Sequence, residues 1–352
     1  MSVTLILGTA KGAFLATSDT DRSAWTVGEP LFKGWKVTAS ARDDGGRYFV
    51  ATASDVYGPA LHVSDDLKKW RQIEKGPAWR QDLDRKLTQI WTLHPGPGRF
   101  YAGVDEAGLF ASDDRGETWS PVEGLNEHAT RSNWLPGNGG LCAHAILVDP
   151  KNTLRVWCGI SAVGVFRSDD GGATWRTRNE GIPAVIEDKQ HKDIGCCVHA
   201  LVADPDDADT IYRREHNGMF RSRDGGDSWQ RIENGLPSWF GFPIAMDRRT
   251  RTLFVHPMES DEYRMPVDGQ FRMYRSRDGG DNWEPLTNGL PQHGAYMGVL
   301  RSAMAVDHLD PCGVYVGTTA GTVYVSNDAG DSWTQLPCTL PRVLSVSVFT
   351  DG

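Results

Sequence analysis

The sequence predicts an all-β fold, a seven-bladed β-propeller, and three observations support this prediction. A phrase of the form Ser-x-Asp-x-Gly-x-Thr-Trp occurs in five clear copies, preceded by two less regular ones. Successive copies begin roughly 46 to 56 residues apart, close to the period of a propeller blade. The chain also closes on a strand-like segment of the kind that opens its other blades. The seven copies span residues 18–25, 64–70, 112–119, 168–175, 222–229, 276–283 and 326–333.

The repeated phrase suits a tight turn followed by a strand. An Asp carboxylate can accept backbone N–H bonds from its own turn, and the glycines tolerate positive φ. The Trp offers a large apolar surface for packing between neighbouring sheets. The acidic pairs Asp113-Asp114 and Asp169-Asp170 are therefore assigned to turns and not to a metal or catalytic site.

The blades can be divided into strands from their residue types. In the fourth blade we expect strands at 144–150, 155–160, 164–170 and 174–179, because β-branched and aromatic runs alternate there with Gly, Pro, Asn and Asp. No segment shows a convincing amphipathic helix. The opening segment TLILGT matches a second strand and the closing segment VLSVSVF matches a first strand. We therefore expect the C-terminal strand to complete the N-terminal blade and close the ring, within a single domain over residues 1–352.

Composition restricts the classes of partner. The chain of 352 residues carries a net charge of −9 without a Lys/Arg block, so a nucleic-acid partner is not expected. The first residues show no basic segment ahead of an apolar run, and no apolar stretch reaches the length of a membrane helix. Six cysteines in a chain of this length do not indicate a disulfide scaffold. These features predict a cytoplasmic protein with reduced thiols and no membrane partner.

Long connections between blades are predicted to gather on the face opposite the repeated turns. They span residues 76–89, 124–141, 181–196 and 289–302, with an insertion at 257–270. Long connections in a compact fold are often functional, and aromatic side chains over a cavity favour a ligand pocket. The alternative is that these aromatic side chains pack the loops against the sheets. Trp79, in the first of these connections, is open to both interpretations. The predicted ligand-binding residues are Trp35, Gln89, Trp134, Trp239, Tyr263 and Tyr296.

Histidines form the first group of candidate catalytic residues. His144 and His199 occupy equivalent positions in two inner strands, two residues after Cys142 and Cys197, and strand alternation would place each Cys and His on one face. His216, in the loop Glu215-His216-Asn217-Gly218, could approach the same end of the central channel. The three histidines could hold a divalent metal such as zinc, or they could transfer protons. The structural alternative is a buried His bonded to a carbonyl beside a Cys that packs as a small apolar residue.

Charged residues form the second group of candidates. Arg301 immediately precedes an inner strand and could clamp an anionic group. Glu215, Glu259 and Asp261 map to the same face and are candidate catalytic carboxylates, with Arg264 nearby in the sequence. Glu259 and Asp261 belong to the long insertion, for which a solvated loop is the alternative interpretation.

The repeated phrase resembles the Asp-box, or bacterial neuraminidase (BNR), repeat. Runs such as GVFRSDDGGATW and FGFPIAMD make the chain similar to seven-bladed bacterial Asp-box propellers, which are often described as exo-alpha-sialidases or glycosyl hydrolases. The repeat also occurs in sialidases, family 74 xyloglucanases, sortilin-type receptors and photosystem assembly factors, so the resemblance implies fold more than function. Sialidases resemble one another in six blades and an N-terminal Arg-Ile-Pro segment. This chain offers only Phe242-Pro243-Ile244, which argues against sialidase activity.

Two functions remain open from the sequence. The first is a small-molecule pocket on the face of the inter-blade loops, for a glycan-like or anionic ligand, with hydrolase or lyase chemistry. The second is a non-catalytic scaffold or assembly factor that binds another protein on the same face. A deep cavity lined by His144, His199 and Arg301 would favour the first, and a flat face with exposed tryptophans would favour the second.

Overall fold

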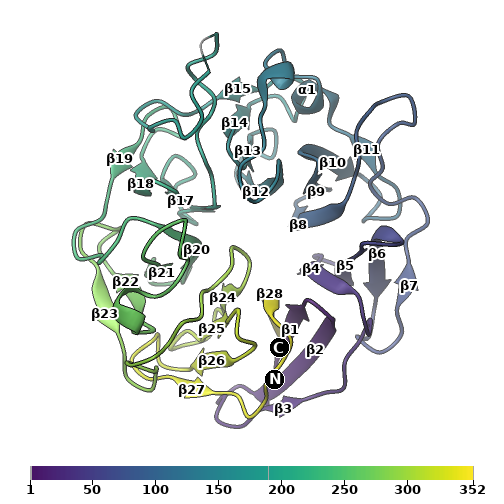
Figure 1. Ribbon diagram of the computed structural model, residues 1–352. Coiled ribbons are helices and arrows are strands. Elements are labelled where there is room, and N and C mark those ends of the chain that lie inside the picture. The colour runs from purple at the N-terminus through teal and green to yellow at the C-terminus, as the bar shows by residue number, and fades with distance from the viewer. Residues whose placement is uncertain (1, 189, 352) are drawn as a thin grey trace. The chain divides into compact units, whose positions relative to one another are not determined.

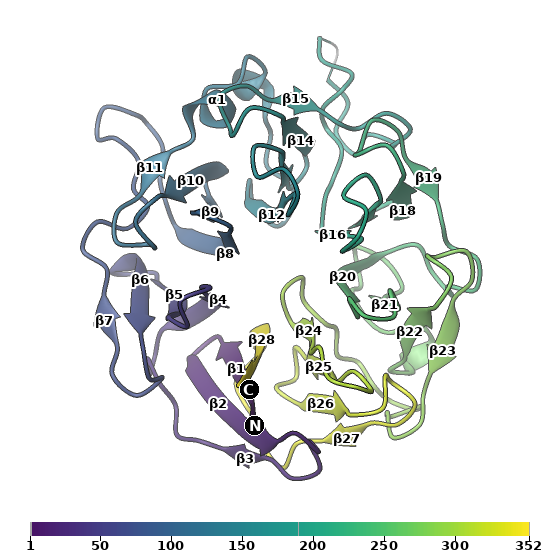
Figure 2. The same cartoon turned by 180° about the vertical axis from the view of Figure 1, so that it is seen from behind.

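The computed structural model describes residues 2–188 and 190–351 and confirms the all-β, seven-bladed β-propeller, with seven sheets of four strands each (Figures 1 and 2). Contacts divide the chain into two compact units. Unit 1 contains the chain up to Val37, Tyr212–Arg221, and the chain from Arg231 onward. Unit 2 contains Thr38–Ile211 and Ser222–Gln230. The two units are described separately below.

The C-terminal strand completes the N-terminal sheet, as the sequence predicts. Strand β28 pairs antiparallel with β1 from Ser2 opposite Asp351 to Thr9 opposite Val343. Figure 1 shows the two ends of the chain beside each other at this sheet. Both faces of β1 are buried, since Val3, Leu5, Ile6 and Leu7 have no exposed surface. The order of this sheet is β28 (Val343–Asp351), β1 (Ser2–Thr9), β2 (Gly12–Asp19), β3 (Thr26–Val27).

The other sheets follow chain order, and their outermost strands are two or three residues long. Two sheets lie in unit 1: β20 (Gly241–Met246), β21 (Leu253–Pro257), β22 (Met273–Ser276), β23 (Glu284–Leu286), and β24 (Met304–Val306), β25 (Val314–Gly317), β26 (Val323–Ser326), β27 (Thr334–Gln335). Three more are β4 (Lys36–Arg42), β5 (Tyr48–Ser54), β6 (Gly58–Ser64), β7 (Arg71–Gln72); β8 (Gln89–Gly96), β9 (Arg99–Asp105), β10 (Gly108–Ser112), β11 (Ser120–Pro121); and β12 (Ala143–Val148), β13 (Val156–Ile160), β14 (Gly164–Ser168), β15 (Arg176–Thr177). The remaining sheet is β16 (Ala200–Ala203), β17 (Ile211–Glu215), β18 (Gly218–Ser222), β19 (Gln230–Arg231).

The repeated phrase has the structural role that the sequence indicates. In the copy after β10, Ser112 Oγ donates to Asp114 Oδ1 at 2.7 Å and accepts from the Gly116 N–H at 2.8 Å. Asp114 Oδ1 accepts from the Thr118 N–H at 2.9 Å, and hydrogen bonds from Thr118 lower the pKa of Asp114 to about 2. Trp119 Nε1 donates to the Gly116 carbonyl at 3.0 Å. The carboxylate is therefore occupied by its own turn.

Several innermost strands carry a β-bulge close to their first residue. The register of β12 shifts between Ala143 and Ala145, and that of β20 shifts between Gly241 and Ile244. His144 therefore lies inside a bulge, and His199 lies just before β16 begins. At His144 the bulge breaks the two-residue period on which the predicted alternation of Cys142 and His144 rests. At the other position a ring nitrogen of His199 lies within 4.8 Å of Cys197 Sγ, as side chains on one face would.

Helices contribute little to this fold. In residues 2–188 and 190–351 the helical segments are α1 (Glu123–Asn126) and the 3₁₀ turns Arg131–Asn133 and Val267–Gly269. No helix in these ranges combines the length and the apolar character that crossing a membrane requires.

Candidate functional site

Strand β17 buries three consecutive charged residues in unit 1. Arg213, Arg214 and Glu215 are each 0% exposed. Arg213 and Glu215 are two residues apart and share one side of the strand, with Arg213 Nη2 3.8 Å from Glu215 Oε2. Arg214 turns the other way, and its Nη2 donates to the Phe240 carbonyl at 2.6 Å. Because buried charges are costly unless they are paired, these contacts define where β17 must lie.

Burial changes the protonation of Glu215. It raises the pKa of this carboxyl to about 7, although Arg213 and the Asn217 N–H, 3.2 Å from Oε1, favour the ionised form. The side chain has no exposed surface, whereas the other predicted catalytic carboxylates, Glu259 and Asp261, are exposed. The sequence did not reveal this difference, and the catalytic role of Glu215 stays a prediction.

The raised pKa of Glu215 predicts a pH-dependent stability. A carboxyl whose folded pKa lies above its unfolded value of 4.5 binds more protons when folded. We therefore expect its contribution to the free energy of unfolding to be complete below pH 4.5 and to be lost as the pH rises through about 7. Urea unfolding of the wild type and of Glu215→Gln across this range checks the expectation. Parallel pH profiles for the two proteins would contradict it.

Arg214 packs against Gly241, where any residue with a Cβ would clash with its guanidinium. A Cβ on Gly241 would lie 2.6 Å from Arg214 Nη2 and 2.6 Å from the His256 carbonyl oxygen. His256 is fully buried, its Nδ1 donates to the Arg272 carbonyl at 3.0 Å, and burial lowers its pKa to about 4. Sequence reasoning missed this buried group. The available signals were the Arg-Arg pair within an apolar strand and the Phe-Gly-Phe run at 240–242.

Two phenylalanines support an outer layer of cationic side chains. Phe240 and Phe242 are 1% and 2% exposed, and their ring centroids lie 5.1 Å apart. The guanidinium carbons of Arg301 and Arg264 lie 4.7 Å and 5.5 Å from the Phe242 centroid. The His216 ring lies 5.4 Å from that of Phe240. Cation–π attraction stabilises this arrangement.

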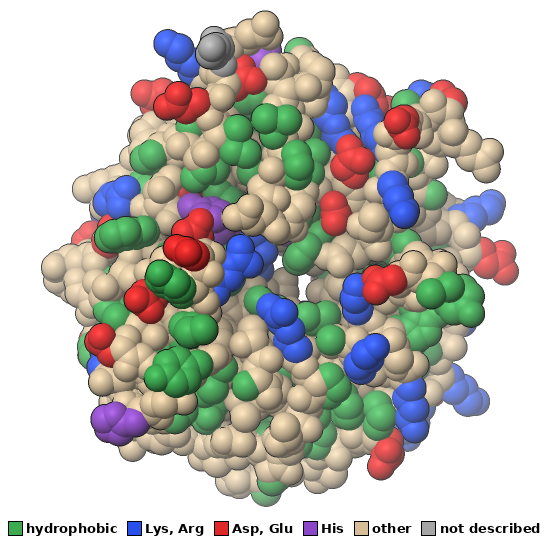
Figure 3. All heavy atoms as spheres, viewed as in Figure 1, with side chains coloured by type: hydrophobic (Ala, Val, Ile, Leu, Met, Phe, Trp, Pro, Cys, Tyr) green, Lys and Arg blue, Asp and Glu red, His purple; other side chains and the backbone are tan. Residues whose placement is uncertain are grey.

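His216 forms a polar pair with Asp261. Its Nε2 lies 3.8 Å from Asp261 Oδ2, and the two side chains are 22% and 51% exposed. Burial lowers the pKa of His216, with smaller contributions from Arg301 and Arg264, while Asp261 acts in the opposite direction. In Figure 3, basic, acidic and histidine side chains gather over the part of unit 1 that holds β20 and β24. A partly exposed His–Asp pair of this kind can transfer protons.

Three exposed aromatic side chains belong to the same group of loops. Trp239, Tyr263 and Tyr296 are 61%, 56% and 70% exposed. Their segments are tied together, since Ser238 Oγ donates to the Met258 carbonyl at 2.6 Å and the Ala295 N–H donates to the Gly269 carbonyl at 2.9 Å. Exposed aromatic side chains beside polar groups are typical of a binding surface. We name this set the basic–aromatic face: His216, Trp239, Phe240, Phe242, Asp261, Tyr263, Arg264, Tyr296 and Arg301.

Unit 2 holds the other predicted histidines. His144 is 8% exposed and packs edge-on against Trp91 at 6.3 Å, and His199 is 1% exposed. Trp134 is also buried, and its Nε1 donates to Thr130 Oγ1 at 2.9 Å, which matches the loop-packing alternative. The divalent metal on His144, His199 and His216 stays a prediction. The two remaining predicted ligand-binding residues, Gln89 in unit 2 and Trp35 in unit 1, are half-buried, and Glu259 is exposed on the insertion of unit 1.

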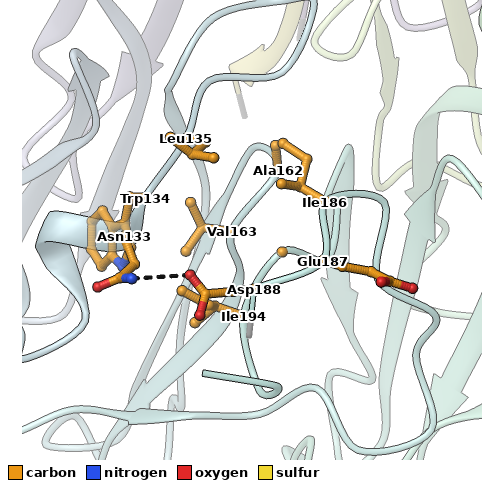
Figure 4. A pocket seen from close by; sticks show the side chains of 10 residues that line it. Asn133, Trp134, Leu135, Ala162, Val163, Ile186, Glu187, Asp188 and Ile194 are labelled. Atoms are coloured by element: carbon orange, nitrogen blue, oxygen red, sulfur yellow. Dashed lines mark hydrogen bonds between the residues drawn. The ribbon is translucent and has the colours of Figure 1, made fainter. Parts of the chain in front are cut away.

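A separate small pocket in unit 2 does not combine the features of an active site (Figure 4). Its empty volume is about 250 Å³, and much of its lining is apolar, including Val163 and Ile194. Asp188 already accepts hydrogen bonds from Asn133 Nδ2 at 3.0 Å and from the Gln190 and His191 N–H groups at 2.7 Å. Its carboxylate therefore serves to hold the loop.

Comparison with known proteins relates the sequence to xyloglucanases. No family model matches the chain. It is 26% identical over 246 residues to the oligoxyloglucan-reducing end-specific xyloglucanase of Emericella nidulans, covering 69% of this chain and 24% of that protein. It is 24% identical over 326 residues to xyloglucanase Xgh74A of Acetivibrio thermocellus, covering 81% and 35%. The chain thus spans about a quarter to a third of the length of these curated relatives.

Solved structures agree on the fold. An ancestral GH74 enzyme matches with a TM-score of 0.60 and 19% identity, covering 85% of this chain and 38% of that one. A Bacteroides uniformis protein provisionally named 6-phosphogluconolactonase matches with a TM-score of 0.61 and 11% identity, covering 99% of both chains. At these identities the likeness shows the fold alone. The chain is an all-β, seven-bladed β-propeller whose sequence relatives include xyloglucanases.

Proposed function

We propose that the basic–aromatic face binds a carbohydrate ligand and that the protein hydrolyses a glycosidic bond there. The observation that carries the proposal is the combination of three exposed aromatic side chains with the His216–Asp261 pair on the loops of one unit. Aromatic faces stack on the apolar faces of sugar rings, and the polar pair supplies proton transfer. The xyloglucanase relatives support a glycan substrate over a protein partner.

The proposed reaction needs one proton donor and one proton acceptor. A water oxygen bonds to the anomeric carbon as the glycosidic C–O bond breaks. The His216 imidazolium gives a proton to the leaving oxygen and then, as the neutral imidazole, takes up the proton released by the water. The Asp261 carboxylate, 3.8 Å from His216 Nε2, orients the ring and stabilises its charged form. Because its pKa is lowered, His216 is protonated only toward acidic pH, so activity should decline as the pH rises.

Substitution of the proposed groups tests this function. With a panel of neutral and acidic oligosaccharides, we expect His216→Asn and Asp261→Asn to lower the hydrolysis rate by about 10²-fold or more. Trp239→Ala should weaken glycan binding, because it removes an exposed stacking surface. His308→Asn, at an exposed position in the turn between β24 and β25, is the matched control and should hydrolyse at the wild-type rate. Wild-type hydrolysis by His216→Asn, or unchanged glycan affinity in Trp239→Ala, would refute the proposal.

A further inference from the structure

We propose that Arg264 and Arg301 form a carboxylate-binding subsite on the basic–aromatic face, so that the glycan ligand carries a uronate. This inference rests on the proposed function and names its substrate class. Arg264 comes from the insertion between β21 and β22, and Arg301 from the segment just before β24. Both guanidinium groups lie over the ring of Phe242.

The insertion holds Arg264 in place at a cost in backbone energy. Arg264 has φ 54°, a left-handed conformation that is unfavourable for a non-glycine residue. The loop maintains it through the Arg264 N–H, which donates to the Ser260 carbonyl at 3.0 Å, and through the Glu259 N–H, which donates to the Met265 carbonyl at 2.8 Å. Arg264 Nε donates to the Asp261 carbonyl at 2.9 Å. The guanidinium is therefore oriented before a ligand arrives, which reduces the entropy lost on binding.

The charge of Arg264 is not used by an internal ion pair. Among residues 2–188 and 190–351, no carboxylate forms a salt bridge with it, and the Asp261 carboxylate faces His216 instead. Arg264 is exposed, while Phe242 beneath it is 2% exposed. One side of the guanidinium thus rests on an apolar ring and its remaining N–H groups are available to a ligand. A planar guanidinium binds a carboxylate through two parallel hydrogen bonds.

The surroundings favour a single negative charge on a sugar. Glu259, Asp261 and Glu262 are exposed on the same insertion and would repel a doubly charged phosphate more strongly than a carboxylate. Tyr263 adjoins Arg264 in the sequence and is 56% exposed, so a pyranose ring could stack beside the acid group that Arg264 holds. These features together point to a uronate-bearing saccharide.

Paired ligands that differ only in charge test the subsite. Titration calorimetry would compare uronate disaccharides with their methyl esters, which keep the shape and remove the charge. We expect the acids to bind about tenfold or more tightly than the esters, because hydrogen bonds to charged groups are stronger. Arg264→Gln and Arg301→Gln should each weaken binding of the acids more than binding of the esters and so remove most of this preference. Arg248→Gln, exposed beyond the other end of β20, should keep the preference.

The outcomes separate this inference from the function on which it rests. Equal affinity for acids and esters, or equal weakening of both in Arg264→Gln, would overturn the carboxylate subsite while leaving glycan binding intact. Tighter binding of sugar phosphates than of uronates would also overturn it. If neither the acids, the esters nor neutral oligosaccharides bind, the proposed function fails together with this inference.

Discussion

Replacing Asp307 by Ala should destabilise the protein by about 3–5 kcal/mol, because it leaves a buried arginine without its counter-charge. Asp307 is 1% exposed, and its Oδ2 accepts from Arg22 Nη1 at 3.0 Å and from the Tyr315 hydroxyl at 2.7 Å. Its Oδ1 accepts from the Gly313 N–H at 2.7 Å. Arg22 is 7% exposed, so water cannot fully replace the lost carboxylate. Urea unfolding would measure the change.

Two controls separate the loss of this network from a general effect of removing a carboxylate. Asp82→Ala breaks an exposed pair in which Arg80 Nε lies 3.3 Å from Asp82 Oδ1, and should cost less than about 1 kcal/mol. The double variant Arg22→Met/Asp307→Leu removes both buried charges and should be more stable than Asp307→Ala. A loss of less than about 1 kcal/mol in Asp307→Ala would show that the buried pair is not important for stability.

Ending the chain after Arg342 should abolish cooperative unfolding of unit 1. Without β28, β1 would become an open edge strand although Val3, Leu5 and Leu7 are fully buried. The loss also removes the Val346 N–H, which donates to the Ser302 carbonyl at 2.7 Å. We expect an aggregating protein without a sharp thermal transition in calorimetry.

A permuted chain distinguishes the need for β28 from a need for its position in the sequence. Ser2 pairs with Asp351, so residues 343–351 can be joined ahead of β1 through a short turn. This permutant should regain a single sharp transition close to that of the wild type. A soluble truncated protein with a wild-type transition would show that β28 is dispensable.

The sequence was most informative where it repeats. The Asp-containing turns and the expected strands appear because their determinants are local. Ser112 and Asp114, for example, bond to N–H groups within four residues, so their role can be inferred without knowing the rest of the fold. The pairing of β28 with β1 is a long-range feature, yet it also followed from the repeat, since each end of the chain holds the strands that the other lacks.

The candidate site was only partly predictable. The sequence identified His216, Asp261 and Arg301 as residue types suited to chemistry, but it treated Glu215 as their equal. The structure buries Glu215 beside Arg213 and leaves His216 and Asp261 partly exposed. Neither the role of Phe242 beneath two arginines nor the fit of Arg214 against Gly241 follows from spacing.

The sequence by itself thus determined the seven four-stranded sheets, the turn role of the repeated Ser, Asp and Trp residues, and the joining of the two termini in one sheet. Only the tertiary structure decided which charged residues are buried and which face outward. The reason is physical. A turn is stabilised by hydrogen bonds between near neighbours in the chain, whereas burial, cation–π contacts and pKa shifts depend on segments far apart in the sequence, such as β17 and the insertion that carries Arg264.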